Sequence, residues 1–146
     1  MELFLASDHA AFAAKEQLKS QLSKKGLVVR DLGPQSDGRC DYPNFAIKLA
    51  RKIQANSQAL GVLLCGSGVG VSMAANRFAG VRAALCRTTE EAVLAKEHNN
   101  ANVLCLGGRV SASEEIMQMV EAWLQAEFQG ERHTVRVALF DQLGEK

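Results

Sequence analysis

The chain has 146 residues, of which 47% are hydrophobic, with 17 Lys and Arg against 16 Asp and Glu. This length is expected to form one domain, residues 1–146, with enough apolar residues to bury a core. The formal net charge of +1 provides no general attraction to nucleic acid or to an anionic membrane. We therefore expect small-molecule partners.

The N-terminal sequence MELFLASDHAAF has only a short apolar run, too short for a secretory signal or a membrane span. A cytoplasmic location is expected. The cysteines show no CxxC or CxxH pair, which argues against structural zinc and against a redox dithiol. Most of them are expected to be buried and reduced. They are Cys40, Cys65, Cys86 and Cys105.

Apolar, strand-like runs alternate with helical stretches along the whole chain. This pattern is typical of a parallel sheet with helices on both faces. The predicted strands cover residues 3–6, 27–32, 61–65, 81–85 and 102–106. The predicted helices cover residues 9–25, 43–54, 70–77, 89–98 and 113–128. The sequence therefore predicts five βα units, followed by an extra helix in residues 131–143 that packs on the body or on a second subunit.

Local signals support the helix starts. Thr88 precedes Glu91 by three residues and Ser111 precedes Glu114 by three, the spacing of a capping box. Pro43 fits a first helical turn, where its missing N–H would be unpaired anyway. The longest irregular segment, residues 33–41, follows the second strand at the edge where open α/β sheets bind ligands.

Polar groups follow several predicted strands. The carboxyl ends of parallel strands form the ligand crevice of such a sheet, so these groups are expected to meet there. The sequence places at these ends Ser7-Asp8-His9, residues 65–70, Cys86-Arg87-Thr88 and Gly107-Gly108-Arg109, and the helix before the fifth strand adds Glu97-His98-Asn99-Asn100.

Residues 65–70 read Cys-Gly-Ser-Gly-Val-Gly. Three glycines in five positions let the backbone turn sharply and aim its N–H groups at one point, which suits an anion. A nucleotide site is not indicated. The segment lacks the Lys-Ser/Thr of a P-loop, Val71 stands where a dinucleotide fingerprint has its third glycine, and the next strand ends in Cys86-Arg87 instead of an acid.

Four residues have both a functional and a structural interpretation. Cys65, between a strand end and a helix start, is either a thiolate favoured by the helix dipole or a buried small hydrophobe. His98 is either an acid–base group or a favourable charge near a helix C-terminus. Arg132 and Arg136 share a helix face, and they form either a phosphate clamp or a solvated basic surface.

Taken together, the motifs resemble the ribose-5-phosphate isomerase type B family, which also contains galactose-6-phosphate and allose-6-phosphate isomerases. The resemblance covers nearly the whole chain. It rests on Ser7-Asp8-His9-Ala10, Asp41-Tyr42-Pro43, residues 65–70, Ala74-Ala75-Asn76-Arg77, Gly80-Val81-Arg82-Ala83, Glu97-His98-Asn99, Asn102-Val103-Leu104, and Gly130-Glu131-Arg132-His133 followed by Arg136.

The resemblance implies a role for each matched position. Cys65 is similar to the family's base, which takes the proton from C2 of the open-chain aldose and returns it to C1. Ser67 is expected to orient or activate the thiol, and His98 to open the furanose ring. The N–H groups expected to face the enediolate oxygen are those of Gly66, Ser67, Gly68, Val69 and Gly70. The expected sugar ligands are Asp8, His9, Tyr42 and Asn99, and the expected phosphate and anion ligands are Arg109, Arg132 and Arg136.

The resemblance also implies a three-layer α/β/α sandwich with a five-stranded parallel sheet, of Rossmann-like type. Neither a metal nor a cofactor is expected. The active protein is expected to be a homodimer or homotetramer with site residues from two chains. Val71 stands where relatives with a glutamate base carry that residue, so the chain resembles the cysteine branch; Ala11 departs from the glycine of many members.

The expected reaction interconverts ribose 5-phosphate and ribulose 5-phosphate, a step of the pentose phosphate pathway. Two alternatives remain at this point. One is an allose-6-phosphate or galactose-6-phosphate isomerase with the same mechanism, and the other is a phosphosugar-binding module without catalysis. Cys65, Ser67 and His98 together favour the ribose enzyme, because the galactose enzymes resemble pairs of unlike subunits in which one partner lacks part of the site.

Overall fold

The computed structural model describes residues 2–146, which form a five-stranded sheet in the order β2-β1-β3-β5-β4 with every pairing parallel. The strands are β1 (Leu3–Ser7), β2 (Val29–Asp31), β3 (Leu60–Cys65), β4 (Ala83–Leu85) and β5 (Val103–Gly107). The predicted parallel α/β architecture is confirmed. Each predicted strand is present, and the three central ones end within one residue of the prediction.

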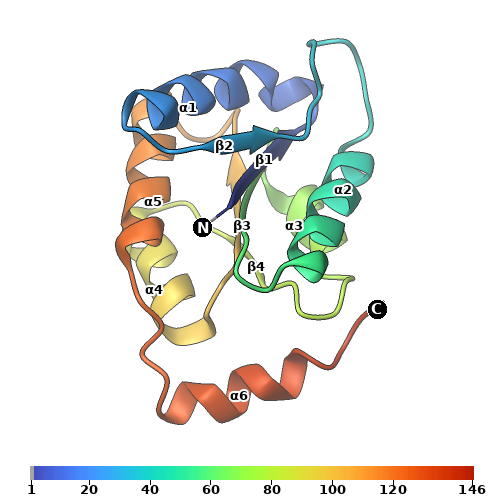
Figure 1. The fold of residues 1–146 in the computed structure, drawn as a ribbon. Helices are drawn as coiled ribbons and strands as arrows, with labels where there is room; N and C mark the ends of the chain where they lie inside the picture. Colours follow the sequence, from blue (N-terminus) through green and yellow to red (C-terminus); the bar gives the residue numbers. More distant parts are fainter. Residues whose placement is uncertain (1) are drawn as a thin grey trace.

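Helices cover both faces of the sheet (Figure 1). One face carries α1 (Phe12–Lys24), α4 (Thr89–Asn99) and α5 (Ser113–Gln125), and the other carries α2 (Tyr42–Ala55) and α3 (Val69–Ala75). A short 3₁₀ turn, η1 (His9–Ala11), precedes α1. The last helix, α6 (Arg132–Phe140), lies at the bottom of the view in Figure 1, below α4 and far from the loop between β2 and α2.

The central strands are buried on both sides, which explains their continuous apolar runs. Along β1, Leu3 and Leu5 enter the core under α1 and α5, whereas Phe4 and Ala6 enter the core under α2 and α3. This alternation follows from the period of two of a strand and produces the two apolar layers of the sandwich.

The edge strands are shorter than predicted, and the structure shows why. Before β4, the backbone N–H of Arg82 donates to Oδ1 of Asn102 at 2.8 Å instead of joining the sheet. Before β2, the N–H of Leu27 donates to the Leu22 carbonyl and closes the end of α1. Backbone N–H groups that the apolar pattern assigned to strands thus form hydrogen bonds with a polar side chain or within a turn instead.

The helix starts at α4 and α5 agree with the prediction, but one N-cap residue was predicted one position early. At α4 the prediction is confirmed, since the Glu91 N–H donates to the Thr88 hydroxyl at 3.1 Å. At α5 the N-cap is Ala112 instead of Ser111, and the carboxylate of Glu115 accepts the Ala112 N–H at 2.8 Å. Pro43 lies in the first turn of α2, as predicted.

The strand order places a switch point between β1 and β3, because the chain leaves β1 toward β2 on one side and returns to β3 on the other. Such a point opens a crevice outside the carboxyl ends of the two strands. None of the helices in residues 2–146 is long and apolar enough to cross a membrane.

We expect the fold to depend on the central strand β3. Replacing Leu64, which is fully buried, by Ala should lower the free energy of unfolding by about 2–5 kcal/mol, because a cavity is left between β3 and the helices. Urea unfolding followed by circular dichroism measures this change. Val28→Ala, at a position 79% exposed, is the control and should change the stability by less than about 0.5 kcal/mol. Equal effects of the two substitutions would contradict this account of the core.

Candidate active site

A cavity of about 690 Å³ opens at the carboxyl ends of β1 and β3, at the switch point. Most of the residues predicted for the site line it. These are Asp8, His9, Tyr42, Cys65, Gly66, Ser67, Val69, Gly70 and Arg109, and the other lining residues are Ala10, Met73 and Val110. The structure therefore gathers one large part of the predicted site in one place.

Cys65 ends β3 and lies at the floor of this cavity, with only 4% of its surface exposed. Its Sγ accepts the backbone N–H of Gly68 at 3.2 Å. A donor to sulfur stabilises the thiolate relative to the thiol. The structure thus has the loop geometry that the sequence predicted for a reactive thiol.

Two glycines of the loop are required by their surroundings. Gly68 has a φ of +80°, and a Cβ there would lie 2.9 Å from the Leu106 carbonyl carbon. A Cβ on Gly70 would lie 2.6 Å from the ring of Tyr42. The loop therefore packs against the backbone of β5 on one side and against Tyr42 on the other.

Hydrogen bonds fix the loop in this position. The Cys65 carbonyl accepts the Gly108 N–H at 2.8 Å, and the Gly66 carbonyl accepts the Arg109 N–H at 3.0 Å. The Arg87 guanidinium donates to the Ser67 carbonyl at 2.8 Å. Arg87 was not among the predicted site residues, although its place directly after a strand was a signal for it. The Ser67 hydroxyl accepts the Val69 N–H at 3.2 Å, which leaves its own proton to donate.

Asp8 and His9 come from the end of β1. Asp8 caps η1, since its Oδ1 accepts the Ala11 N–H at 3.1 Å, which leaves Oδ2 for a ligand. His9 Nδ1 lies 3.2 Å from the backbone nitrogen and 3.0 Å from the carbonyl oxygen of Cys40. The loop before α2 therefore occupies Nδ1, and Nε2 is the ring atom left for a ligand in the cavity.

Gly68 belongs to the Cys65 loop without lining the cavity, and the other remaining predicted residues do not reach the cavity within the chain, which corrects the expectation that they share one crevice. His98 and Asn99 end α4, and Arg132 and Arg136 lie on α6. A helix that starts at the carboxyl end of one strand returns to the amino end of the next, so the last turn of α4 lies at the opposite edge of the sheet. Asn99 borders a separate hollow there, beside Ala83 and Phe140.

These residues form a second cluster. The His98 and His133 rings stack with centroids 4.4 Å apart and planes 12° apart, which joins α4 to α6. Burial, followed by the neighbouring Arg132, His98 and Arg136, lowers the pKa of His133. Its Nε2 is buried without a hydrogen-bond partner in the part of the chain that the structure describes. The sequence analysis did not assign a role to His133, whose only signal was its place beside Arg132.

The cysteines differ in their surroundings. Burial, with a contribution from Glu91, raises the pKa of Cys86 to about 12, and burial raises the pKa of Cys105 well above its usual value. Both thiols therefore stay protonated near neutral pH. The prediction that most cysteines are buried and free is confirmed for residues 2–146: Cys65, Cys86 and Cys105 are buried, and Cys40 is partly exposed. No group of three His, Cys, Asp or Glu side chains in this range is arranged to hold a metal ion.

Comparison with known proteins adds the family. The model of the family described as Ribose/Galactose Isomerase matches residues 3–140. The chain belongs to this family. Among similar members, the probable ribose-5-phosphate isomerase B of Mycoplasma pneumoniae is 46% identical over 92% of this chain and 90% of its own length. The ribose-5-phosphate isomerase B of Escherichia coli is 42% identical over 89% of this chain and 87% of its own length.

Solved structures of family members have the same fold. The ribose 5-phosphate isomerase of Thermotoga maritima superposes with a TM-score of 0.93 at 45% identity, covering 96% of this chain and 97% of that one. The ribose-5-phosphate isomerase B of Mycoplasma genitalium, solved with bound ribulose-5-phosphate, gives a TM-score of 0.92 at 44% identity, covering 96% of this chain and 93% of that one.

The surroundings of the cysteines predict a selective reaction with iodoacetamide. At pH 8 the reagent should modify Cys65, through the cavity, and the partly exposed Cys40, and should leave Cys86 and Cys105 unmodified because their raised pKa values keep them as thiols. Peptide mass spectrometry of the native protein measures the modification, and inorganic phosphate should slow it at Cys65 only. Modification of Cys86 as fast as that of Cys65 would show that burial does not control reactivity here.

Proposed function

We propose that the protein interconverts ribose 5-phosphate and ribulose 5-phosphate through an enediolate, with Cys65 as the base. The observation that carries the proposal is the single cavity in which Cys65, the loop amides and the end of β1 meet, in a chain that belongs to the Ribose/Galactose Isomerase family. A sugar phosphate is the kind of molecule bound by the Mycoplasma genitalium relative.

In this proposal the Cys65 thiolate removes the C2 proton of the open-chain aldose and returns it to C1, while the hydroxyl proton of O2 passes to O1 across the enediolate. The Gly68 N–H that donates to Sγ supports the thiolate before the transfer. The loop amides from Gly66 to Gly70 face the oxygen that gains charge, and the Ser67 hydroxyl, held by Val69, donates a proton to the same region. Asp8, His9 and Tyr42 hold the sugar hydroxyl groups.

Before C2 becomes acidic, a furanose must lose its O1 proton and gain one on the ring oxygen. We assign this step to His98, because an imidazole can accept the proton from one oxygen and donate a proton to the other. Asn99 would hold the sugar, and Arg132 and Arg136 the phosphate, with Arg109 as a further cation beside the Cys65 loop. Four of these residues lie at the opposite edge of their own sheet, namely His98, Asn99, Arg132 and Arg136. The proposal therefore needs a second chain to supply them.

The face of α6 that carries the arginines supports a homodimer with a shared site. The cytoplasmic location and a tetramer built from two such dimers stay predictions. Arg132, Val135, Arg136 and Leu139 follow the i, i+3, i+4, i+7 spacing of one helix face. Val135 and Leu139 are 68% and 72% exposed. Exposed apolar side chains beside two arginines that form no ion pair within residues 2–146 favour an interface at which the arginines reach a neighbour's ligand.

An isomerase assay tests the reaction. The protein should convert ribose 5-phosphate faster than allose 6-phosphate or galactose 6-phosphate, and Cys65→Ala should lower turnover at least about a hundred-fold, because the proposed base is removed. Binding of inorganic phosphate by calorimetry should be nearly unchanged in this variant. Cys86→Ala is the matched control and should keep its turnover. Substantial activity in Cys65→Ala would exclude Cys65 as the base, and a preference for a hexose phosphate would assign the protein to the other branch of the family.

Mixing two inactive variants tests the shared site. Cys65→Ala and His98→Asn should each be inactive alone, but a mixed dimer has one site with both changes and one with neither. Random exchange makes half of the dimers mixed, each with one intact site, so activity should return to about a quarter of the wild-type value. Co-expression with two affinity tags gives the same mixed dimers for a direct assay. No recovery in the purified mixed dimer would mean that each chain completes its own site.

A further inference from the structure

Arg82 directly precedes β4, in a motif that has no role in the proposed reaction, and its side chain is only 14% exposed. Its main chain is fixed by Asn102, which is buried and directly precedes β5. The Arg82 N–H donates to Asn102 Oδ1 at 2.8 Å, and the Arg82 carbonyl accepts the Asn102 N–H at 3.1 Å. The guanidinium group therefore extends from a fixed point at the amino edge of the sheet.

The guanidinium of Arg82 joins the ends of two helices. Its Nε donates to the carbonyl of Asn100, the residue directly after α4, at 2.7 Å. Its Nη1 donates to Oδ1 of Asp141, the residue directly after α6, at 2.8 Å. These are the two helices that carry the second cluster of predicted site residues. One side chain thus links both of them outside the cavity of Cys65.

Asp141 lies where a carboxylate is unfavourable without a cation beside it. It is the C-cap of α6, and its N–H donates to the Val137 carbonyl at 3.1 Å. The helix dipole opposes a negative charge at this end and favours a positive one. Arg82 supplies the positive charge for Asp141 and for the carbonyl groups that end α4. Side chains that break such a local rule are expected where a tertiary contact or a functional site requires them.

The position of α6 depends on contacts of this kind. The helix has nine residues, of which two are buried, and a helix of this length is not stable alone. Its first end is held against α4 by the stack of His133 on His98 and by the Gln129 N–H, which donates to the Glu97 carbonyl at 3.0 Å. A helix held at one end can still change its direction. The ion pair with Arg82 holds the other end.

We propose that Arg82 is a positioning residue for the half of the site that α4 and α6 supply: with Asp141 it fixes the direction of α6 relative to α4. The proposal rests on the proposed function, in which His98 opens the sugar ring while Arg132 and Arg136 bind the phosphate. A clamp of two guanidinium groups needs a defined geometry, and a small displacement of either group weakens it. Arg136 lies between the stacked end of α6 and Asp141, so its position depends on both ends.

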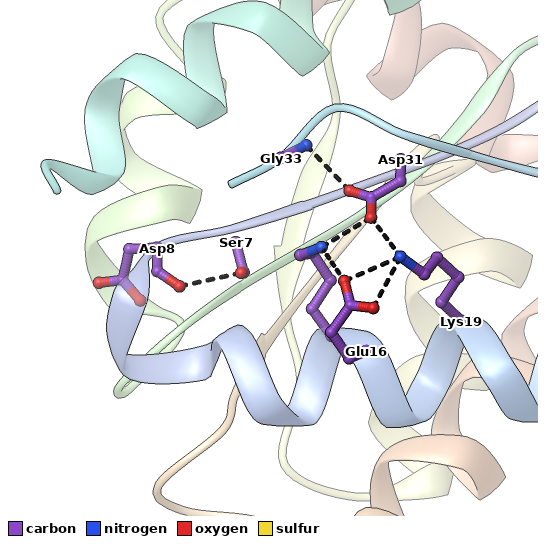
Figure 2. Close-up of polar contacts among 7 residues, drawn as sticks. Ser7, Asp8, Glu16, Lys19, Asp31 and Gly33 are labelled. Atoms are coloured by element: carbon purple, nitrogen blue, oxygen red, sulfur yellow. Dashed lines mark hydrogen bonds and ion pairs between the residues drawn. The ribbon is translucent and has the colours of Figure 1, made fainter. Parts of the chain in front are cut away.

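A second group of charged side chains, between α1 and β2, offers a matched control. Glu16 accepts hydrogen bonds from Lys15 and Lys19 at 2.6 and 2.8 Å (Figure 2). Its side chain is 38% exposed, close to the 36% of Asp141. Helix α1 lies at the top of the view in Figure 1 and α6 at the bottom. Glu16→Gln therefore removes one carboxylate from an ion pair, as Asp141→Asn does, on elements that do not hold α6.

The first test measures ligand binding. In Arg82→Gln the KM for ribose 5-phosphate and the inhibition constant of inorganic phosphate should rise about ten-fold, and in Asp141→Asn about three-fold, because the contact with Asn100 remains. Adding Asp141→Asn to Arg82→Gln should cause no further rise, since Asp141 acts through Arg82. Arg82→Lys keeps the charge but cannot reach both acceptors, and should restore binding only in part. In Glu16→Gln both constants should stay within about two-fold of the wild-type values.

The second test separates a displaced α6 from a general loss of structure. Without phosphate, iodoacetamide should modify Cys65 in Arg82→Gln at a rate within about two-fold of the wild type, because Arg82 does not line that cavity. Protection of Cys65 should then need about ten times more inorganic phosphate. A role of Arg82 in stability alone would leave the phosphate requirement of the folded enzyme unchanged.

A third measurement needs no ligand. Hydrogen exchange of peptides from α6 should be faster in Asp141→Asn than in the wild type, whereas exchange of α6 in Glu16→Gln should be unchanged. If the wild type does not isomerise ribose 5-phosphate, the proposed function fails, and exchange in α6 still shows whether Arg82 and Asp141 hold this helix.

An unchanged KM and an unchanged phosphate inhibition constant in folded Arg82→Gln would overturn the proposal. An equal rise of both constants in Glu16→Gln would also overturn it, and so would a further rise when Asp141→Asn is added to Arg82→Gln. If Arg82→Gln does not fold, Asp141→Asn, at a partly exposed side chain, takes its place. Unchanged constants and unchanged exchange of α6 in that variant would count against the proposal in the same way.

Discussion

The site depends on a close contact between two main chains, the turn after β3 and the end of β5. Pairing of these chains continues past the strands, through the hydrogen bonds from Gly108 to Cys65 and from Arg109 to Gly66. The contact leaves no room for side chains. A Cβ on Gly107 would lie 2.8 Å from the Ser67 carbonyl oxygen, and one on Gly68 would lie 2.9 Å from Leu106. Glycine at these positions allows the loop to fold back, and the folded loop brings the Gly68 N–H onto the Cys65 sulfur.

Much of this arrangement could be predicted from the sequence. Buried parallel strands are continuous apolar runs, so β1, β3 and β5 were found within one residue at each end. The edge strands β2 and β4 were predicted too long. At β4, the hydrogen-bond acceptor that replaces sheet pairing, the Asn102 side chain on the Arg82 N–H, comes from a distant part of the chain. The N-cap of α5 was assigned one residue early, because Ser111 and Ala112 are each followed three residues later by a glutamate.

For the site, sequence motifs identified residues but not the chain that supplies them. Topology separates His98 from Cys65, since a helix that crosses from β4 to β5 must end at the amino edge of the sheet. The family resemblance implied a site shared between two chains, but residue types and spacing alone do not say which motif a second chain would supply. The stack of His98 on His133 could not be predicted either, because it needs the relative position of α4 and α6.

The distribution of positive charge follows from the chemistry of a thiolate beside a phosphorylated substrate. Two unit negative charges about 6 Å apart repel by about 3 kcal/mol at an effective dielectric constant of about 20. A phosphate bound without counter-charges would therefore oppose formation of the thiolate. Arg109, which lines the cavity, and the proposed clamp of Arg132 and Arg136 offset this repulsion from two directions. In the proposed shared site the arginines thus contribute to proton transfer as well as to affinity.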